Sequence, residues 1–173
     1  IQSASFSPDG RSVMASDSGG GILLWDAASG RTLLRFAQTD MAVTTFLPDG
    51  RTALSGSADG SLMVWDLFNG AEVRRFEGHE GGINDVAFTP DGEKALSLGG
   101  NDPRFNVPGE NDNSLRVWNV ATGEQLQLLA GHTDMGVSID VSPDGSKALS
   151  VALDYSMRLW DLESGAEIRR FEI

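Results

Sequence analysis

Four copies of one pattern run through the chain. A Pro-Asp-Gly triplet begins at residues 8, 48, 90 and 143, and a tryptophan follows at residues 25, 65, 118 and 160. The proline and the tryptophan lie 17 residues apart in three copies and 28 apart in the third, which therefore carries an insertion of 11 residues. This repetition constrains the fold more than any other feature, because each copy must form the same local structure.

Each copy predicts four β-strands. Apolar and polar residues alternate over short runs, and turn residues separate the runs, as is typical of strands. In the second copy the predicted strands span residues 43–47, 52–57, 61–65 and 72–76. The triplet predicts the first turn and Asp59-Gly60 predicts a tight hairpin. Three hairpins in series make a four-stranded antiparallel sheet, so we predict an all-β chain.

The tryptophan is followed by aspartate or asparagine in every copy, and two copies begin with a Gly-His pair. The matching dipeptides are Trp25-Asp26, Trp65-Asp66, Trp118-Asn119, Trp160-Asp161, Gly78-His79 and Gly131-His132. On these residues the chain resembles the WD40-repeat family over essentially its whole length. The resemblance implies a WD40-type β-propeller, in which four-stranded antiparallel blades pack around a central channel. The four blades are then expected at residues 1–40, 41–77, 78–130 with the insertion 101–111, and 131–173.

Four blades are fewer than the seven or eight that closed WD40 propellers usually contain. The outer faces of the first and last blades are expected to expose apolar sheet, which a soluble protein rarely leaves uncovered. We therefore expect the blades to form part of a larger ring, rather than a ring of four. Further blades in a longer chain, or a homo-oligomer in which two chains complete an eight-bladed ring, are both compatible with this expectation.

WD40 blades often hold a hydrogen-bonded tetrad of histidine, serine or threonine, aspartate and tryptophan. A simple alignment assigns this structural role to nine residues: His79, Asp112, Trp118, His132, Asp154, Trp160, Ser57, Asp59 and Trp65. In this alignment the serine position of the third blade falls on Gly99 or the insertion, and that of the fourth falls on Ala152. Thr39 stands where the second blade would have its histidine. No blade is then expected to contain all four members.

Two histidines near serines and aspartates also raise the possibility of a nucleophilic triad. Both histidines fall at the tetrad position, so neither is left for general-base chemistry, and we predict no catalytic residue and no enzyme activity. The chain has no cysteine, which excludes disulfides, thiolate metal sites and a cysteine nucleophile. No glycine-rich phosphate motif occurs before a helix, and we predict no cofactor.

The insertion and its exit, residues 101–113, contain several oxygen-bearing side chains of the kind that calcium prefers. Their spacing fits no EF-hand loop, so we predict a solvated polar loop and no metal site. In WD40 propellers this loop lies on the top face, where partners commonly dock. Arg104 and Phe105 are residue types enriched at interface hot spots. The alternative is that Phe105 packs back onto its own blade.

Three further residues complete the candidate partner-binding set on the same face. Asn111 and Leu153 directly precede the aspartates of their hairpins, and Leu153 and Tyr155 are unusual residues for a hairpin tip. Large apolar or aromatic side chains in such positions are candidates for contacts with a protein or peptide partner.

The chain is acidic, with a net charge of −12 from 25 acidic and 13 basic residues. This balance argues against nucleic-acid binding, which depends on Lys and Arg against phosphates. No apolar run approaches the length of a membrane helix. We therefore predict a non-catalytic protein-protein interaction scaffold that binds through its top face. The alternatives are a structural or assembly module attached to a catalytic domain outside this chain, and a propeller hydrolase.

Overall fold

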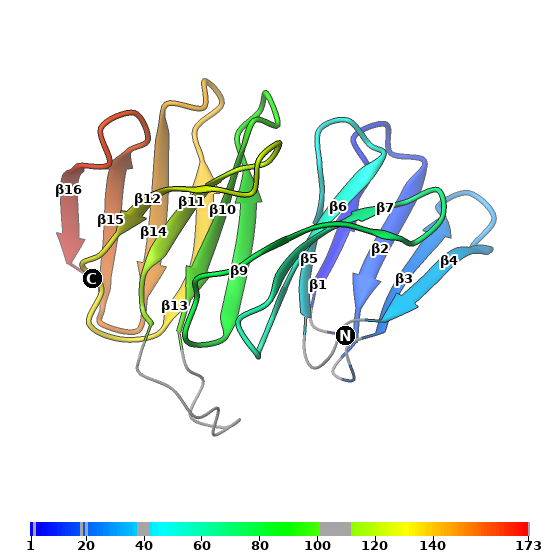
Figure 1. Cartoon of the computed structure of the whole chain (residues 1–173), viewed down its shortest axis with the longest axis horizontal. Coiled ribbons are helices and arrows are strands. Elements are labelled where there is room, and N and C mark those ends of the chain that lie inside the picture. Colours follow the sequence, from blue (N-terminus) through cyan, green and yellow to red (C-terminus); the bar gives the residue numbers. More distant parts are fainter. Residues whose placement is uncertain (2, 18, 20, 38–41, 101–111, 173) are drawn as a thin grey trace.

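The computed structural model describes the whole chain except residues 2, 18, 20, 38–41, 101–111 and 173. Within the described residues the chain forms strands and no helix, and the strands assemble into four sheets of four strands each (Figure 1). The prediction of an all-β chain of four-stranded antiparallel sheets is confirmed. Because the described part lacks helices, it contains no helix able to span a membrane.

Sheets 1 and 2 follow each other along the first half of the chain. Sheet 1 contains β1 (Ser3–Phe6), β2 (Ser12–Ser16), β3 (Gly21–Asp26) and β4 (Thr32–Ala37). Sheet 2 contains β5 (Ala42–Phe46), β6 (Thr52–Ser57), β7 (Leu62–Asp66) and β8 (Glu72–Phe76). The four strands predicted for the second copy agree with β5–β8 to within one residue at each end.

Sheets 3 and 4 repeat the arrangement in the second half. Sheet 3 contains β9 (Ile83–Phe88), β10 (Lys94–Gly99), β11 (Leu115–Asn119) and β12 (Gln125–Leu129). Sheet 4 contains β13 (Gly136–Val141), β14 (Lys147–Ala152), β15 (Ser156–Asp161) and β16 (Glu167–Glu172). In every sheet the strands pair antiparallel in chain order.

The Pro-Asp-Gly triplets make the turns between the first and second strands. In sheet 2 the Gly50 N–H donates to the Leu47 carbonyl at 3.0 Å, and the Asp49 carboxylate accepts from the backbone N–H of Arg51 at 2.8 Å. Gly50 has a φ of 65°, a left-handed conformation that glycine adopts without steric cost. The triplet therefore fixes the turn through both its aspartate and its glycine.

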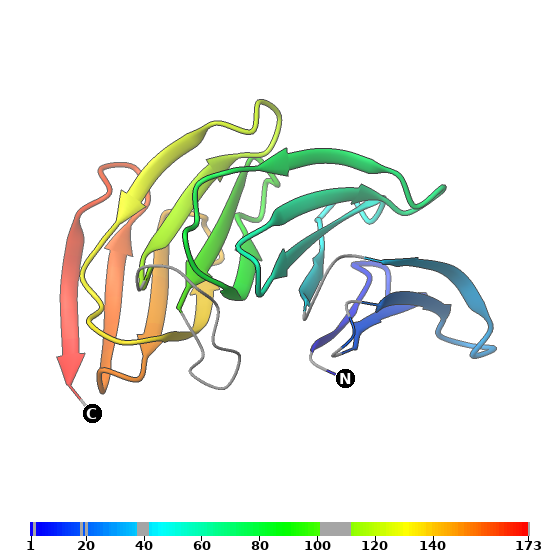
Figure 2. The same cartoon turned by 60° about the horizontal axis from the view of Figure 1, so that its bottom comes forward.

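The four sheets fan out in an arc, with sheet 1 and sheet 4 at its two ends (Figure 2). The first strands of successive sheets lie side by side, β1 against β5, β5 against β9 and β9 against β13. We call the face of a sheet that is turned toward the preceding sheet its leading face, and the face turned toward the following sheet its trailing face.

Each apolar core lies between the trailing face of one sheet and the leading face of the next. The first joins Met14, Ile22, Leu24 and Phe36 of sheet 1 to Phe46, Ala53, Met63 and Trp65 of sheet 2. The second joins Leu54, Leu62, Val64 and Phe76 of sheet 2 to Val86, Ala95 and Trp118 of sheet 3. The third joins Leu96, Leu98, Leu115, Val117 and Leu129 of sheet 3 to Ile139, Ala148 and Trp160 of sheet 4 and to Leu162 in the turn after β15. No single sheet could bury its apolar face alone.

Candidate functional site

A continuous chain of hydrogen bonds crosses sheet 3. It runs from the core to the turn between β10 and β11, which lies at the end of the sheet that we call the top face. The Trp118 indole donates from Nε1 to Ser97 Oγ at 2.8 Å, and Ser97 Oγ lies 2.7 Å from His79 Nε2. His79 Nδ1 lies 2.8 Å from Asp112 Oδ2. The four residues come from β11, β10, the connection before β9 and the turn before β11. They therefore link two strands, a connection and a turn of the same repeat.

The chemistry of the four groups fixes the direction of these bonds. An indole N–H can only donate, and an ionised carboxylate can only accept. The network is therefore complete when His79 is neutral, with its Nδ1–H donating to Asp112 and its Nε2 accepting the Ser97 hydroxyl proton. Every polar atom then has a partner, which is the condition for burying such a network without a penalty.

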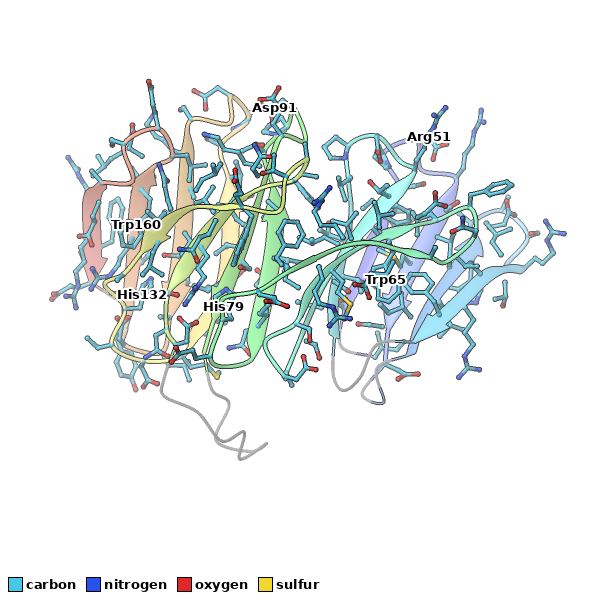
Figure 3. The ribbon with its side chains drawn as sticks, in the orientation of Figure 1. Arg51, Trp65, His79, Asp91, His132 and Trp160 are labelled. Carbon is cyan, nitrogen blue, oxygen red and sulfur yellow. The ribbon has the colours of Figure 1, made fainter. Side chains whose placement is uncertain are left out.

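Sheet 4 repeats the network with the same geometry. Trp160 Nε1 donates to Ser150 Oγ at 2.9 Å, His132 Nε2 lies 2.8 Å from Ser150 Oγ, and His132 Nδ1 lies 3.0 Å from Asp154 Oδ2. In the orientation of Figure 3 the top face of the sheets points downward. His79 and His132 lie toward this lower side of the picture, whereas Arg51 and Asp91 mark the opposite side.

The serine position expected from the sequence is wrong in sheets 2, 3 and 4. In sheet 2 the Trp65 indole donates to Ser55 at 2.7 Å and not to Ser57. In sheets 3 and 4 the hydroxyl comes from Ser97 and Ser150, whereas the sequence alignment pointed to Gly99 and Ala152. The expectation that no blade holds all four members is therefore also wrong, because sheets 3 and 4 each hold a complete set.

A constant spacing would have identified these serines. Each stands seven residues after the proline of its triplet, at Ser55, Ser97 and Ser150. The first sheet has Ala15 at this position, so Trp25 meets no hydroxyl there. In sheet 2 Asp59 accepts from the Ser61 backbone N–H at 2.9 Å and so holds the hairpin. The histidine position of that sheet, Thr39, lies outside the described residues.

The buried networks have no access to a substrate. Ser97 and Ser150 are both 0% exposed, and the side chains of His79 and His132 are each 1% exposed. A nucleophile must reach the atom it attacks, and its base must have a free nitrogen for the proton. Both nitrogens of both histidines are occupied, so these groups stabilise the fold. Among the described residues there is also no group of three or more His, Asp or Glu side chains able to hold a metal ion.

The aspartates are held ionised by their donors. Burial alone would raise the pKa of Asp154, but hydrogen bonds from Ser156, Thr133 and His132 outweigh it and keep that pKa well below its usual range. Asp112 behaves in the same way, because hydrogen bonds from His79 and Ser114 outweigh burial and lower its pKa. These carboxylates are therefore acceptors at neutral pH, as the direction of the networks requires.

Acidification is expected to destabilise the chain first through His132. Burial lowers the pKa of His132 in the folded state, although its hydrogen bond to Asp154 opposes this shift. The unfolded chain takes up a proton near pH 6.5, whereas the folded chain resists it. The free energy of unfolding should therefore fall as the pH drops below about 6.5. Urea unfolding at pH 7.5 and pH 5.5 measures this fall, and it should be smaller in His132→Gln. An equal fall in both proteins would contradict the assignment.

On the top face, sheet 4 presents two of the predicted partner-binding residues. Leu153 and Tyr155 form the hairpin tip between β14 and β15, and they are 49% and 77% exposed. The Leu153 N–H donates to the Met135 carbonyl at 2.9 Å, which joins this hairpin to the connection before β13. The other predicted residues, Arg104, Phe105 and Asn111, lie outside the described residues.

Tyr155 has a feature that the sequence interpretation missed. Its φ is 58°, and it is the non-glycine residue in the described chain with a positive φ. The corresponding hairpin of sheet 2 has Gly60 there, with a φ of 83°. Comparison with Gly60 would have revealed the strain, because a bulky residue in this conformation costs about 1–2 kcal/mol.

A groove of about 560 Å³ lies between sheets 1 and 2, on the face opposite the top face. Its lining is mostly apolar and includes Leu24, Leu33, Phe46, Leu67 and Phe68. At the matching place between sheets 2 and 3, the Arg74 guanidinium donates to the Thr122 carbonyl at 2.9 Å. Leu34 replaces this arginine in sheet 1, so the groove has no such bridge.

The comparison with known proteins agrees with the repeats. The family model described as WD domain, G-beta repeat, matches residues 33–66, 70–119 and 123–161. The chain is 33% identical over 101 residues to the small ribosomal subunit protein RACK1 of Candida albicans, which covers 55% of the chain and 29% of that protein. It is 36% identical over 85 residues to the nuclear distribution protein PAC1 of Arthroderma otae, covering 49% of the chain and 18% of that protein.

A third relative is subunit I of eukaryotic translation initiation factor 3 from Xenopus tropicalis. It is 32% identical over 96 residues, covering 56% of the chain and 26% of that protein. The matched part thus spans less than a third of the length of each of these relatives. The three matched segments together cover well over half of the chain, and the chain belongs to the WD40 family.

Proposed function

We propose that the chain is a non-catalytic interaction scaffold that binds a protein or peptide partner on its top face. The binding surface is a patch on sheet 4 consisting of Met135, Val137, Leu153 and Tyr155, which we call the sheet-4 patch. The observation that supports it is the exposed, left-handed Tyr155 at a position where sheet 2 has glycine. Strained residues that the surrounding structure holds in place are concentrated at functional sites.

The hairpin around Tyr155 is held firmly enough to keep this strain. The Asp154 carboxylate accepts from the Ser156 backbone N–H at 3.0 Å and from the Ser156 hydroxyl at 2.7 Å. The other carboxylate oxygen accepts from the Thr133 N–H at 3.1 Å. The hairpin and the preceding connection therefore share one carboxylate, which presents Tyr155 in a fixed position and lowers the entropy lost on binding.

The patch indicates the chemistry of its partner. Val137 is 44% exposed, so apolar area extends from the hairpin tip onto β13. A tyrosine beside aliphatic residues suits an apolar or aromatic anchor on the partner. The chain carries a net charge of −12, which favours a partner with basic residues around that anchor.

The names of two relatives are consistent with this proposal. One is a protein of the small ribosomal subunit and another is a subunit of a translation initiation factor, so both are parts of larger assemblies. For the present chain, membership of an assembly is part of the proposal. Completion of the arc, by a second copy or by further blades in a longer chain, stays a separate prediction and does not enter the argument for this binding surface.

Replacing Tyr155 by glycine is expected to weaken binding without weakening the fold. Glycine relieves the left-handed strain but loses more backbone entropy on folding, so the free energy of unfolding should change by less than about 1 kcal/mol. Peptides selected from a display library against the wild-type chain provide the probe. Their affinity should fall about 30-fold, the loss expected for a hot-spot residue of about 2 kcal/mol.

Phe68→Ser provides the matched control, because Phe68 is 95% exposed but lies in the turn after β7, on the opposite face. It should leave the affinity unchanged. Peptides that bind Tyr155→Gly as tightly as the wild-type chain, and that lose affinity for Phe68→Ser, would place the partner on the other face.

A further inference from the structure

The fourth strand of each sheet forms the outer side of the arc. The first strands lie side by side on the inner side, so β4, β8, β12 and β16 lie outside (Figure 2). In the sheets as described, each of these outer strands pairs with a neighbour on one side alone. Its other side therefore presents backbone N–H and C=O groups that can pair with a further strand. Proteins commonly protect such edges with charged side chains.

Of the four outer strands, three carry charged side chains. In β8 the Arg75 guanidinium donates to the Glu72 carboxylate from Nε at 3.2 Å and from Nη2 at 2.9 Å. In β16 Arg170 Nε lies 3.7 Å from Glu172 Oε1, and β4 contains Arg35. The sequence of β12 is Gln-Leu-Gln-Leu-Leu, without a charged residue. The outer edge of sheet 3 therefore lacks the protection that the other three sheets have.

The strand register shows which residue replaces the arginine in β12. Leu128 stands opposite Arg116, the residue two before the tryptophan of its repeat, and it is 52% exposed. The corresponding pairs of the other sheets all place arginine on the outer strand: Arg35 opposite Leu23, Arg75 opposite Met63 and Arg170 opposite Arg158. An exposed aliphatic side chain thus occupies the position that is charged elsewhere.

Leu126 extends this apolar surface. It is 46% exposed and stands two residues before Leu128, so both side chains point to the same face of the sheet. We call residues 125–129 the β12 edge. The position of Leu126 is aliphatic and exposed in every sheet, as Leu33, Val73 and Ile168 show. A bulge next to the tryptophan is also common to all four sheets. The exposed leucine pair is what distinguishes sheet 3.

The rest of the strand is fixed by contacts with the body of the protein. Leu129 is 3% exposed in the core between sheets 3 and 4. Gln127 donates from Nε2 to the Glu163 carbonyl at 3.0 Å, and Gln125 Oε1 accepts from Arg116 Nη1 at 2.7 Å. The β12 edge is therefore ordered before any partner arrives, which lowers the entropy lost on binding.

The charges around the β12 edge indicate the chemistry of its partner. Glu124 directly precedes the strand and is exposed. Glu77 is also exposed, and it directly precedes Gly78, where a Cβ would lie 3.3 Å from Gln125 Oε1. The chain as a whole carries a net charge of −12. A segment with basic residues is attracted to such a surface, whereas a second copy of the same acidic chain is repelled.

We propose that the β12 edge binds an extended segment of a partner protein, which adds to sheet 3 as a fifth strand. The segment contains alternating apolar residues with Lys or Arg among them. Backbone hydrogen bonds to β12 supply affinity, and apolar contacts with Leu126 and Leu128 supply specificity. This surface lies on the outer side of the arc, apart from the sheet-4 patch, and its occupant is a separate one.

Leu128→Arg tests the proposal because it restores the charge of the other outer strands. The variant should fold, since sheet 4 already holds Arg170 opposite Arg158. Peptides from a random display library are selected on the full wild-type chain and counter-selected on the variant. The recovered peptides should be basic with alternating apolar residues, and Leu128→Arg should weaken their binding at least about tenfold. Val73→Arg, the matched change on β8, should leave the affinity unchanged. Proline at the peptide's central apolar position should abolish binding, because proline lacks the N–H that pairs with a strand.

Hydrogen exchange of the backbone amides locates the bound peptide. The peptide should slow exchange in β12 and leave the amides around Tyr155 unchanged. A library that yields no peptide sensitive to Leu128→Arg overturns the proposal, and so does protection that falls outside the β12 edge. Sedimentation equilibrium covers the remaining occupant. A wild-type dimer that becomes monomeric in Leu128→Arg would assign the edge to a second copy and overturn the assignment to a partner.

Discussion

Replacing Trp118 by alanine is expected to lower the free energy of unfolding by about 3–5 kcal/mol, the usual range for truncation of a large buried aromatic residue. Trp118 is 1% exposed, and its ring packs on Phe76 of sheet 2 with the centroids 5.6 Å apart. The change would therefore open a cavity between two sheets as well as remove the indole donor to Ser97. Urea unfolding followed by circular dichroism measures the loss.

Two variants show which part of the loss comes from packing. Trp118→Phe keeps most of the ring but removes Nε1–H, and it should cost about 1–2 kcal/mol. Phe68→Ala removes an aromatic ring that is 95% exposed, and it should change stability by less than about 0.5 kcal/mol. If Trp118→Ala loses no more than Phe68→Ala, the ring does not support the core between sheets 2 and 3.

Replacing Ser97 by alanine should cost about 2–4 kcal/mol, although it deletes a single oxygen atom. The Ser97 hydroxyl accepts from the Trp118 indole and donates to His79, and it is 0% exposed. Without it a buried donor and a buried acceptor both lose their partner, and each such group costs about 1–3 kcal/mol. Denaturant unfolding of the variant at pH 7 measures the effect.

A double-mutant cycle tests whether the serine and the tryptophan act together. Once Trp118→Phe has removed the indole donor, Ser97→Ala leaves only His79 without a partner. The second change should then cost about 1 kcal/mol less than in the wild-type chain, within the range of couplings between residues in contact. Additive losses would mean that the hydroxyl acts on the two residues independently.

The regular features of the chain were predictable because they repeat. The Pro-Asp-Gly turns and the Trp-Asp ends mark each hairpin, and the strands predicted for sheet 2 match β5–β8 within one residue. Repetition averages out the uncertainty of any one copy, since a boundary that is ambiguous in one sheet is clear in another. For the same reason, the tryptophan and histidine positions of the networks were found correctly in sheets 3 and 4.

The serine of the network was assigned to the wrong residue because side chains two residues apart on a strand point to the same face of the sheet. Ser55 and Ser57 both lie on β6 and point to the same side, so the alternation of apolar and polar residues cannot choose between them. The choice depends on the pairing register, which sets Ala53 opposite Trp65 and so brings Ser55 within reach of the indole. Register is a property of two strands together, and one strand's pattern does not contain it.

The shared cores also bear on how such a chain changes its length during evolution. Every apolar surface inside the arc joins the trailing face of one repeat to the leading face of the next, and all three junctions use the same positions. A duplicated repeat would bring one face of each kind, so it could enter between any two existing repeats and meet surfaces that already fit it. Loss or gain of a fraction of a repeat would instead break a junction. Gene duplication should therefore alter this chain in whole repeats of roughly 40 residues.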